Sequence, residues 1–276
     1  MGARHVLKNE PAVEADSVGA QSLEDNFALR HAGWASRAPD GLKAAFGWLM
    51  TTGQTVRWAT QEIVLRRMLQ NQSRVEAAAD IGCGGGHYLL DLLVPIAQRI
   101  TGIDIFPENL RIAEQRIRQR GLTDRARIVN AGAEAVPLED ESVDLVLCTE
   151  VLEHLPDAGH ALREFRRILR DGGRAILSIP IPPDPYPNPE HLHASFVPAD
   201  LEALLAANGF SIVDRATCMF AITRGVLWLT QALRVPLPLV PICRLEQAMS
   251  SWISWPRPYN YICTAVKLPS STASGI

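Results

Sequence analysis

A glycine-rich turn that follows an apolar stretch is the feature that most constrains how this chain folds. Residues 76–81 are apolar except for Glu76 and Asp80, glycine occupies positions 82, 84 and 86, and an apolar run covers most of residues 88–93. Glycine lets the backbone turn with positive φ and lets a ligand approach where a Cβ would collide. The pattern predicts a strand, a tight turn and a helix that together cradle a nucleotide or a nucleoside.

The spacing of the glycines narrows the choice of ligand. A dinucleotide fingerprint would need a glycine at position 87, which is His87. A phosphate-binding P-loop would end in Gly-Lys-Ser or Gly-Lys-Thr, and no such ending follows. Residues 80–86, Asp-Ile-Gly-Cys-Gly-Gly-Gly, instead resemble the first motif of class I S-adenosylmethionine-dependent methyltransferases. The cofactor-binding residues that this resemblance implies in the turn are Asp80, Gly82, Cys83, Gly84 and Gly86.

Strand and helix patterns alternate downstream of this turn, which predicts a parallel sheet covered on both faces. The predicted strands are residues 76–81, 99–105, 126–130, 143–148, 174–179, 210–214 and 259–267. The predicted helices are residues 87–98, 107–120, 158–170 and 198–208. This order resembles the methyltransferase sheet, so we expect an α/β three-layer sandwich. Its sheet would be seven-stranded and mostly parallel, with the last strand antiparallel.

Three parts of the chain differ in pattern. Residues 1–70 read as a flexible arm followed by a helical N-terminal cap, and residues 269–276 as a disordered tail. Residues 71–268 would then form the domain that binds S-adenosylmethionine. Within it, residues 215–258 lack a clear period and are expected to form a helical insertion or lid before the last strand.

Composition and charge exclude several classes of protein. A formal charge of −3 argues against a non-specific nucleic-acid binder, so no nucleic-acid partner is expected. Five cysteines without a Cys-x-x-Cys pair read as free thiols, and no secretory signal is apparent, so we expect a cytoplasmic protein. The apolar stretch at residues 225–242 is interrupted by Arg234 and several prolines, which argues against a transmembrane segment. A buried or lipid-facing element, with peripheral membrane contact, remains open, as does the oligomeric state.

The resemblance extends to three further strand ends. Asp104, at the end of the second strand, would accept hydrogen bonds from the ribose hydroxyls, with Ile105 beside the adenine. After the third strand, the backbone of Ala133 and the side chain of Glu134 would face the adenine, although the family's usual aspartate is replaced by Gly132. The remaining implied cofactor-binding residue is Thr149, which ends the fourth strand.

Two groups of residues are candidates to act on the acceptor. On a helix, Glu150, Glu153 and His154 would share one face. They could hold a divalent cation, as in the quinone-biosynthesis O-methyltransferases that this segment also resembles, or act as a base near the acceptor; we assign no metal. Neutral imidazole suits proton removal near pH 7. The candidate catalytic residues are therefore His154 and, in the proline-rich loop after the fifth strand, His191 and His193.

Taken together, the residues predict an S-adenosylmethionine-dependent methyltransferase. It would transfer methyl by in-line displacement to a small, hydrophobic acceptor, with a hydroxyl oxygen as the favoured atom. The alternatives are a quinone-type O-methyltransferase with a divalent metal, an N- or C-methyltransferase, and a non-catalytic methyltransferase-like binding protein. A nicotinamide-dependent oxidoreductase is a further rival, which His87 disfavours.

Overall fold

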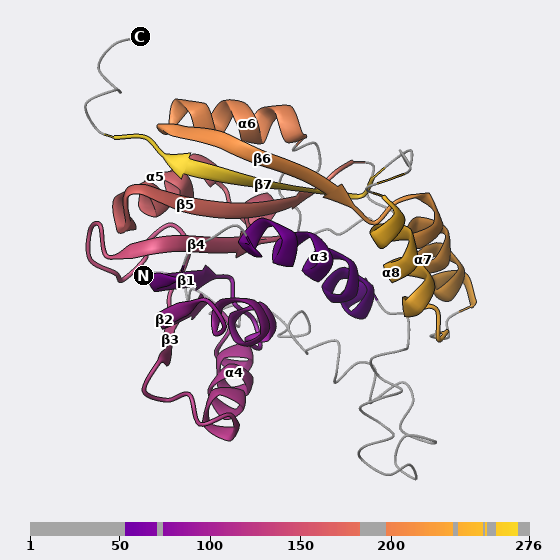
Figure 1. Ribbon diagram of the computed structural model, residues 1–276, viewed down its shortest axis with the longest axis horizontal. Helices are drawn as coiled ribbons and strands as arrows, with labels where there is room; N and C mark the ends of the chain where they lie inside the picture. Colours follow the sequence, from indigo (N-terminus) through magenta and orange to yellow (C-terminus); the bar gives the residue numbers. More distant parts are fainter. Residues whose placement is uncertain are drawn as a thin grey trace, which may run out of the picture. The chain divides into compact units, whose positions relative to one another are not determined.

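A seven-stranded sheet organises the part of the chain that the computed structural model describes (Figure 1). That part comprises residues 53–70, 74–182, 197–233, 237–250, 252 and 258–269, all within one compact unit, Ala38–Ile276. The strands are β1 Val75–Ile81, β2 Ala97–Asp104, β3 Ala126–Asn130, β4 Val143–Thr149, β5 Leu169–Pro180, β6 Phe210–Cys218 and β7 Asn260–Lys267.

The strand order is β3-β2-β1-β4-β5-β7-β6. Neighbours from β3 to β5 pair in parallel, whereas β7 runs antiparallel to both β5 and β6. The predicted sheet with a final antiparallel strand is therefore confirmed. Because β1, β2 and β4 run in the same direction, their carboxyl ends meet at one edge, with Ile81 level with Ile103 and Cys148.

Helices cover both faces of the sheet. Their bounds are α3 Gly53–Gln70, the π-helix η1 Leu89–Leu93, α4 Pro107–Gln119, the 3₁₀ turn η2 Leu152–His154, α5 Ala158–Ile168, α6 Pro198–Ala207, α7 Ala221–Leu233 and α8 Val240–Met249. One core joins side chains of α3, η1, α4, α7 and α8 to one face, and a second joins α5 and α6 to the other. This arrangement gives the three layers that strand and helix alternation predicts.

The two cores follow from the alternation of side chains along the central strands. In β1, Ala78 belongs to the first core, whereas Ala77, Ala79 and Ile81 belong to the second. Both cores need apolar side chains, because a central parallel strand is buried on its two faces. The near-continuous apolar run that marked β1 in the sequence is the result.

Several predicted boundaries differ from the structure. The helix predicted over residues 87–98 ends early: η1 stops at Leu93, Pro95 lies in a turn, and β2 begins at Ala97. A proline within a helix removes a backbone donor and favours such a turn. Strand β6 continues to Cys218, paired with β7 as far as Asn260, so the insertion begins after Cys218 rather than at residue 215.

The predicted N-terminal cap falls only partly within the described residues. Helix α3 supplies its last part, and it packs against η1, β6 and α8. In this contact Trp58 stacks on His87, with ring centroids 4.5 Å apart. The rest of residues 1–70 and the predicted tail at 270–276 lie outside the described residues.

Candidate functional site

The turn after β1 has the geometry that its glycines predict. Gly82 has φ +74°, and a Cβ there would collide with the side chain of Val151. Gly84 has φ +51°, and a Cβ there would meet no atom within 4 Å, so the backbone at this position borders open space. The amides of Gly82 and Cys83 both donate to the carbonyl of Ile103, at 2.7 and 3.0 Å. The turn is thus fixed to β2 while one side of it stays open to a ligand.

Asp104 connects this turn to the end of β2. Its side chain is buried, and Oδ2 accepts from the amide of Gly84 at 2.8 Å while Oδ1 accepts from the amide of Phe106 at 2.9 Å. Each carboxylate oxygen can accept more than one hydrogen bond. The carboxylate therefore lies at the open turn, and its oxygens can accept further hydrogen bonds from hydroxyl groups.

Two exposed apolar side chains follow Asp104. Ile105 is 58% exposed and Phe106 is 44% exposed, although both sit at the start of a well-packed helix, α4. Ile105 lies beside Gly132, 3.8 Å from where a Cβ would stand. Across from them, Ala133 is buried and Glu134 is partly buried. This edge offers an apolar surface of the kind that binds a flat aromatic base.

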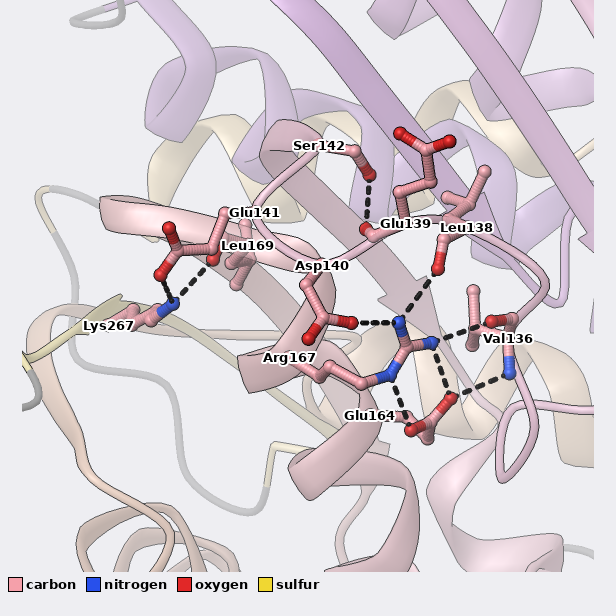
Figure 2. Close-up of polar contacts among 10 residues, drawn as sticks. All are labelled: Val136, Leu138, Glu139, Asp140, Glu141, Ser142, Glu164, Arg167, Leu169 and Lys267. Atoms are coloured by element: carbon pink, nitrogen blue, oxygen red, sulfur yellow. Dashed lines mark hydrogen bonds and ion pairs between the residues drawn. The ribbon is translucent and has the colours of Figure 1, made fainter.

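The loop that carries Ala133 and Glu134 is held from α5 by Arg167, as Figure 2 shows. The guanidinium donates to the carbonyls of Val136 and Leu138, both at 2.7 Å, and to Asp140 at 2.7 Å. Glu164 receives two further bonds from Arg167 and accepts from the amide of Val136 at 2.9 Å. These carboxylates raise the pKa of Arg167 further above its usual range, so the clamp stays charged.

Beyond the end of β4, Glu150 lies at the centre of a polar network. Its backbone has φ +56°, rare for a residue other than glycine, and its amide donates to the carbonyl of Ser178 at 3.2 Å. Its Oε1 accepts from the Ser178 hydroxyl at 2.8 Å, the Asn260 amide at 2.6 Å and the Gln61 amide at 3.3 Å. The second oxygen, Oε2, is buried without a hydrogen bond, 3.8 Å from Nη1 of Arg57.

Gln61 extends this network from α3 to the turn after β1. Its amide donates to Asn260 at 3.0 Å, and its oxygen accepts from the Tyr88 hydroxyl at 2.8 Å. Burial raises the pKa of Tyr88 well above its usual value, so the phenol remains a donor. Five segments therefore join at one polar cluster: α3, the turn after β1, the end of β4, β5 and β7. The polar cluster consists of Arg57, Gln61, Tyr88, Glu150, Ser178 and Asn260.

Asp80, the residue before the last in β1, is a buried carboxyl group. Burial and the nearby charge of Asp104 raise its pKa from about 4 to about 7. Its Oδ2 is buried and has no hydrogen-bond partner among the described residues. A carboxyl in this position gains from any cation placed next to it.

Comparison with known proteins agrees with this geometry. A family model described as a methyltransferase domain matches residues 79–177. The ubiquinone biosynthesis O-methyltransferase of Aeromonas salmonicida is 31% identical over 51% of this chain and 66% of its own length. The sterol 4-C-methyltransferase strm-1 of Caenorhabditis elegans is 32% identical over 36% and 29%. Among solved structures, the cyclase SpnF has a TM-score of 0.55 at 21% identity, covering 78% of this chain and 82% of that one.

The matched region contains β1, the glycine turn, Asp104 and the end of β4. Residues 79–177 form a class I S-adenosylmethionine-dependent methyltransferase domain. The chain spans about a third of the length of the first curated relatives that it matches. The likeness to SpnF, at 21% identity, shows the fold of the domain.

The methyltransferase domain brings most of the predicted cofactor-binding residues to one edge of the sheet. Asp80, the glycine turn, Asp104 and Thr149 lie at the carboxyl ends of β1, β2 and β4, and Ile105 follows directly. Gly86 has φ +78° and packs against Ala113 of α4, so it contributes to the shape of the turn. Cys83 is buried, and burial raises the pKa of its thiol far above the usual range.

The prediction that three ionisable residues share one helix face is wrong. Glu150 precedes η2 and adopts a left-handed backbone, so it does not continue the turn that holds Glu153 and His154. Glu153 is buried and its Oε1 lies 3.9 Å from Nε2 of His154, whose side chain is about one-third exposed. Within the described ranges, no three His, Cys, Asp or Glu side chains are grouped so that they could hold a metal ion.

Three further predictions concern the loop histidines, the cysteines and the membrane. His191 and His193 fall in residues 183–196, outside the described part of the chain. All five cysteines are free and buried. Among the helices that the structure describes, none has both the length and the apolarity needed to cross a membrane.

Sequence reasoning missed most of the polar cluster. Arg57, Gln61, Ser178 and Asn260 were not among the predicted site residues, because their partners come from elements far apart in the chain. A signal was present for two of them. Ser178 and Asn260 are buried polar residues near the ends of apolar strands, at the sheet edge where ligands bind in open α/β folds.

Proposed function

We propose that this chain transfers a methyl group from S-adenosylmethionine to a small hydrophobic acceptor, at a hydroxyl oxygen. The observation that carries the proposal is the open backbone at Gly84 next to the Asp104 carboxylate, because a Cβ at this glycine would fill space that a ligand needs. A carboxylate with free acceptor capacity beside an open glycine turn suits a ribose.

The chain offers a matching group for each part of the cofactor. Asp104 would accept from the ribose hydroxyls, and Ile105, with Phe106, would cover one face of the adenine. The amide of Ala133 and the carboxylate of Glu134 would take the place of the contact that Gly132 cannot make. The methionine part would lie over the turn, with its positive charge near the Asp80 carboxyl group, whose raised pKa falls when a cation approaches.

The reaction needs alignment more than strong acid or base chemistry. When bound, S-adenosylmethionine supplies a methyl group on a positively charged sulfur, and charge disappears as the methyl is transferred. Positioning and exclusion of water can supply roughly 7–11 kcal/mol of the barrier. A base contributes less, roughly 10²- to 10⁴-fold in rate. The chain's main task is therefore to hold the acceptor oxygen in line.

Glu150 is the residue best placed to remove the acceptor proton. Three donors occupy its Oε1, which fixes the carboxylate and leaves the buried Oε2 as the accepting atom. Nη1 of Arg57 lies 3.8 Å from this oxygen, within ion-pair distance. His154 remains a second candidate, since its side chain is partly exposed close to the same turn.

A hydrophobic acceptor is supported from two directions. The names of the similar enzymes specify a sterol for the Caenorhabditis elegans protein and ubiquinone biosynthesis for the Aeromonas salmonicida protein. The insertion between β6 and β7 is also rich in exposed apolar side chains. Both features suit an acceptor that partitions into lipid or into an apolar pocket.

The test is methyl transfer with radiolabelled S-adenosylmethionine to a lipid extract and, in parallel, to a polar metabolite extract. Label in a product that partitions into organic solvent supports the proposal. Label only in the polar extract would contradict the acceptor class. Binding of S-adenosylhomocysteine without any labelled product would favour a second candidate.

That second candidate is a protein that keeps the fold but catalyses no methyl transfer. The likeness to SpnF, which is named as a cyclase, favours it, since this fold also serves other chemistry. The two candidates differ in one measurable property. A methyltransferase consumes S-adenosylmethionine when its acceptor is present, whereas the second candidate leaves the cofactor unchanged.

A further inference from the structure

The helical hairpin between β6 and β7 exposes an unusual number of apolar side chains. Of the thirteen large apolar side chains that are exposed in the described part of the chain, eight lie between Cys218 and Asn260. We call these eight the apolar hairpin face: Ile222, Trp228, Leu229, Leu233, Ile242, Leu245, Met249 and Trp252. At the other exposed positions that the structure describes in α7 and α8, the residue is alanine, glycine or proline, and none is charged.

Two polar side chains of α8, Glu246 and Gln247, point inward. Glu246 of α8 is buried and accepts from the amides of Ile222 and Thr223, at 2.7 and 2.8 Å, and from the Thr223 hydroxyl at 2.5 Å. Gln247, also buried, accepts from the amide of Met219 at 3.2 Å and donates to the carbonyl of Thr217 at 3.3 Å. These contacts fix which side of each helix faces the sheet, so the outward orientation of the apolar side chains is built into the fold.

The charge of the segment differs from that of the whole chain. Residues 219–258 contain four arginines and one glutamate, a formal net charge of +3, whereas the full chain carries −3. The single acidic residue is the buried Glu246. A segment that combines an apolar face with a net positive charge, and whose one acidic residue is buried, is complementary to an anionic, apolar partner.

We propose that the apolar hairpin face docks onto the surface of an anionic lipid bilayer. Trp228 and Trp252, two of its most exposed members, belong to the residue type that is enriched where hydrocarbon meets water. Leucine, isoleucine and methionine between them can enter the outer hydrocarbon layer, and the partly exposed Arg224 and Arg244 can pair with lipid phosphates. The hairpin lies on the bilayer in this arrangement, because neither helix is long enough to cross it.

The position of the hairpin connects docking to the candidate site. Strand β6 ends at Cys218, which pairs with Asn260, and Asn260 pairs with Pro180 at the end of β5. The hairpin therefore leaves the sheet at the carboxyl edge that also carries Glu150, and α8 packs against α3, as Figure 1 shows at the gold helices. If the proposed function holds, a bilayer at this face is the source of the hydrophobic acceptor. The docking itself requires no catalytic activity.

The experiment is co-sedimentation of the full chain with vesicles of phosphatidylcholine alone and of phosphatidylcholine mixed with phosphatidylglycerol. We expect binding to the mixed vesicles at least about tenfold tighter than to the neutral ones, and weakened by salt. The variant Leu245→Gln, alone and combined with Trp228→Gln, should lose about tenfold or more of this binding. Val213→Gln is the matched control, because Val213 is 57% exposed on β6, compared with 59% for Leu245 on α8.

Three outcomes would overturn the proposal. The first is no binding to the mixed vesicles. The second is vesicle binding that Leu245→Gln and Val213→Gln reduce equally, which would place the contact elsewhere. The third is a dimer, seen by light scattering, that Leu245→Gln dissociates while vesicles bind neither form; the face would then join two copies of the chain. Titration of each variant with S-adenosylhomocysteine tests the proposed function separately, since Leu245 lies outside the cofactor-binding residues.

Discussion

At Glu150, a left-handed backbone supports a buried carboxylate. Such a conformation costs a non-glycine residue roughly 1–3 kcal/mol and persists only where the surroundings determine it. The surroundings here are the Ser178 carbonyl and the three donors on Oε1. The three donors fix the direction of the carboxylate, which is what a base in an aligned reaction requires.

The variant Glu150→Gln tests this role. Glutamine keeps the size and the accepting oxygen but cannot take a proton, so we expect kcat to fall by roughly 10²- to 10⁴-fold. The affinity for S-adenosylhomocysteine should stay nearly unchanged, as measured by calorimetry. His154→Gln is the comparison: a large loss of kcat in that variant, with little in Glu150→Gln, would assign the base to His154 instead.

The raised pKa of Asp80 predicts that the free energy of unfolding depends on pH. Its pKa is about 7 in the folded chain and about 4 when unfolded, so between these values the folded state holds a proton that the unfolded state has lost. The free energy of unfolding therefore falls as pH rises from about 4 to about 7, by up to roughly 1.4 kcal/mol per pH unit from this group. Below pH 4 and above pH 7 its contribution is constant.

Asp80→Asn removes this group's titration. Urea unfolding of both proteins at several pH values between 4.5 and 8, spanning roughly the window set by the two pKa values, measures the difference. We expect the variant to gain stability relative to the wild type as pH rises, and the gain to level off above about pH 7. A difference that does not change with pH would contradict the raised pKa.

At the scale of elements, the sequence predicted the features that depend on neighbouring residues better than those that depend on long-range contacts. The strand, glycine turn and helix around Gly82 were predictable because each follows from apolar runs and glycine spacing within a few residues. The short length of η1 and the full length of β6 could not be predicted in this way. Strand β6 continues because Asp214 to Cys218 pair with β7, which lies more than forty residues downstream. The polar cluster around Glu150 was not predicted for the same reason, because it joins residues of α3, β5 and β7, which lie far apart in the chain.

The clamp from α5 onto the loop between β3 and β4 is an element-level contact that mutation can test (Figure 2). Arg167→Met keeps much of the side-chain volume but removes its bonds to Val136, Leu138, Asp140 and Glu164. Hydrogen bonds to charged groups contribute about 1.5–3 kcal/mol each at most, and they are not additive. We expect the free energy of unfolding to fall by about 1.5–3 kcal/mol.

Arg163→Met is the control for this clamp. Arg163 also lies on α5, but it forms an ion pair with the exposed Asp157, at 3.2 Å. Exposed pairs contribute about 0–1 kcal/mol, so this change should have little effect on unfolding in urea. Equal losses in both variants would show that Arg167 does not hold the loop.

At the scale of the whole molecule, one edge of the sheet gathers the glycine turn, the polar cluster and the start of the helical hairpin. Ligands bind at this edge in open α/β folds because loops there can vary without disturbing the sheet. The two cores lie on the faces of the sheet. The same scaffold can therefore carry a cofactor site and a separate docking surface side by side.

The central claim, that Asp104 and the open turn bind S-adenosylmethionine, is tested most directly by calorimetric titration with S-adenosylhomocysteine. The wild type should bind one molecule, and Asp104→Ala should bind about 10- to 150-fold more weakly, the equivalent of about 1.5–3 kcal/mol for a lost charged acceptor. Asp124→Ala, which removes an exposed carboxylate before β3, should match the wild type. No binding by the wild type, or equal affinity in Asp104→Ala, would contradict the account.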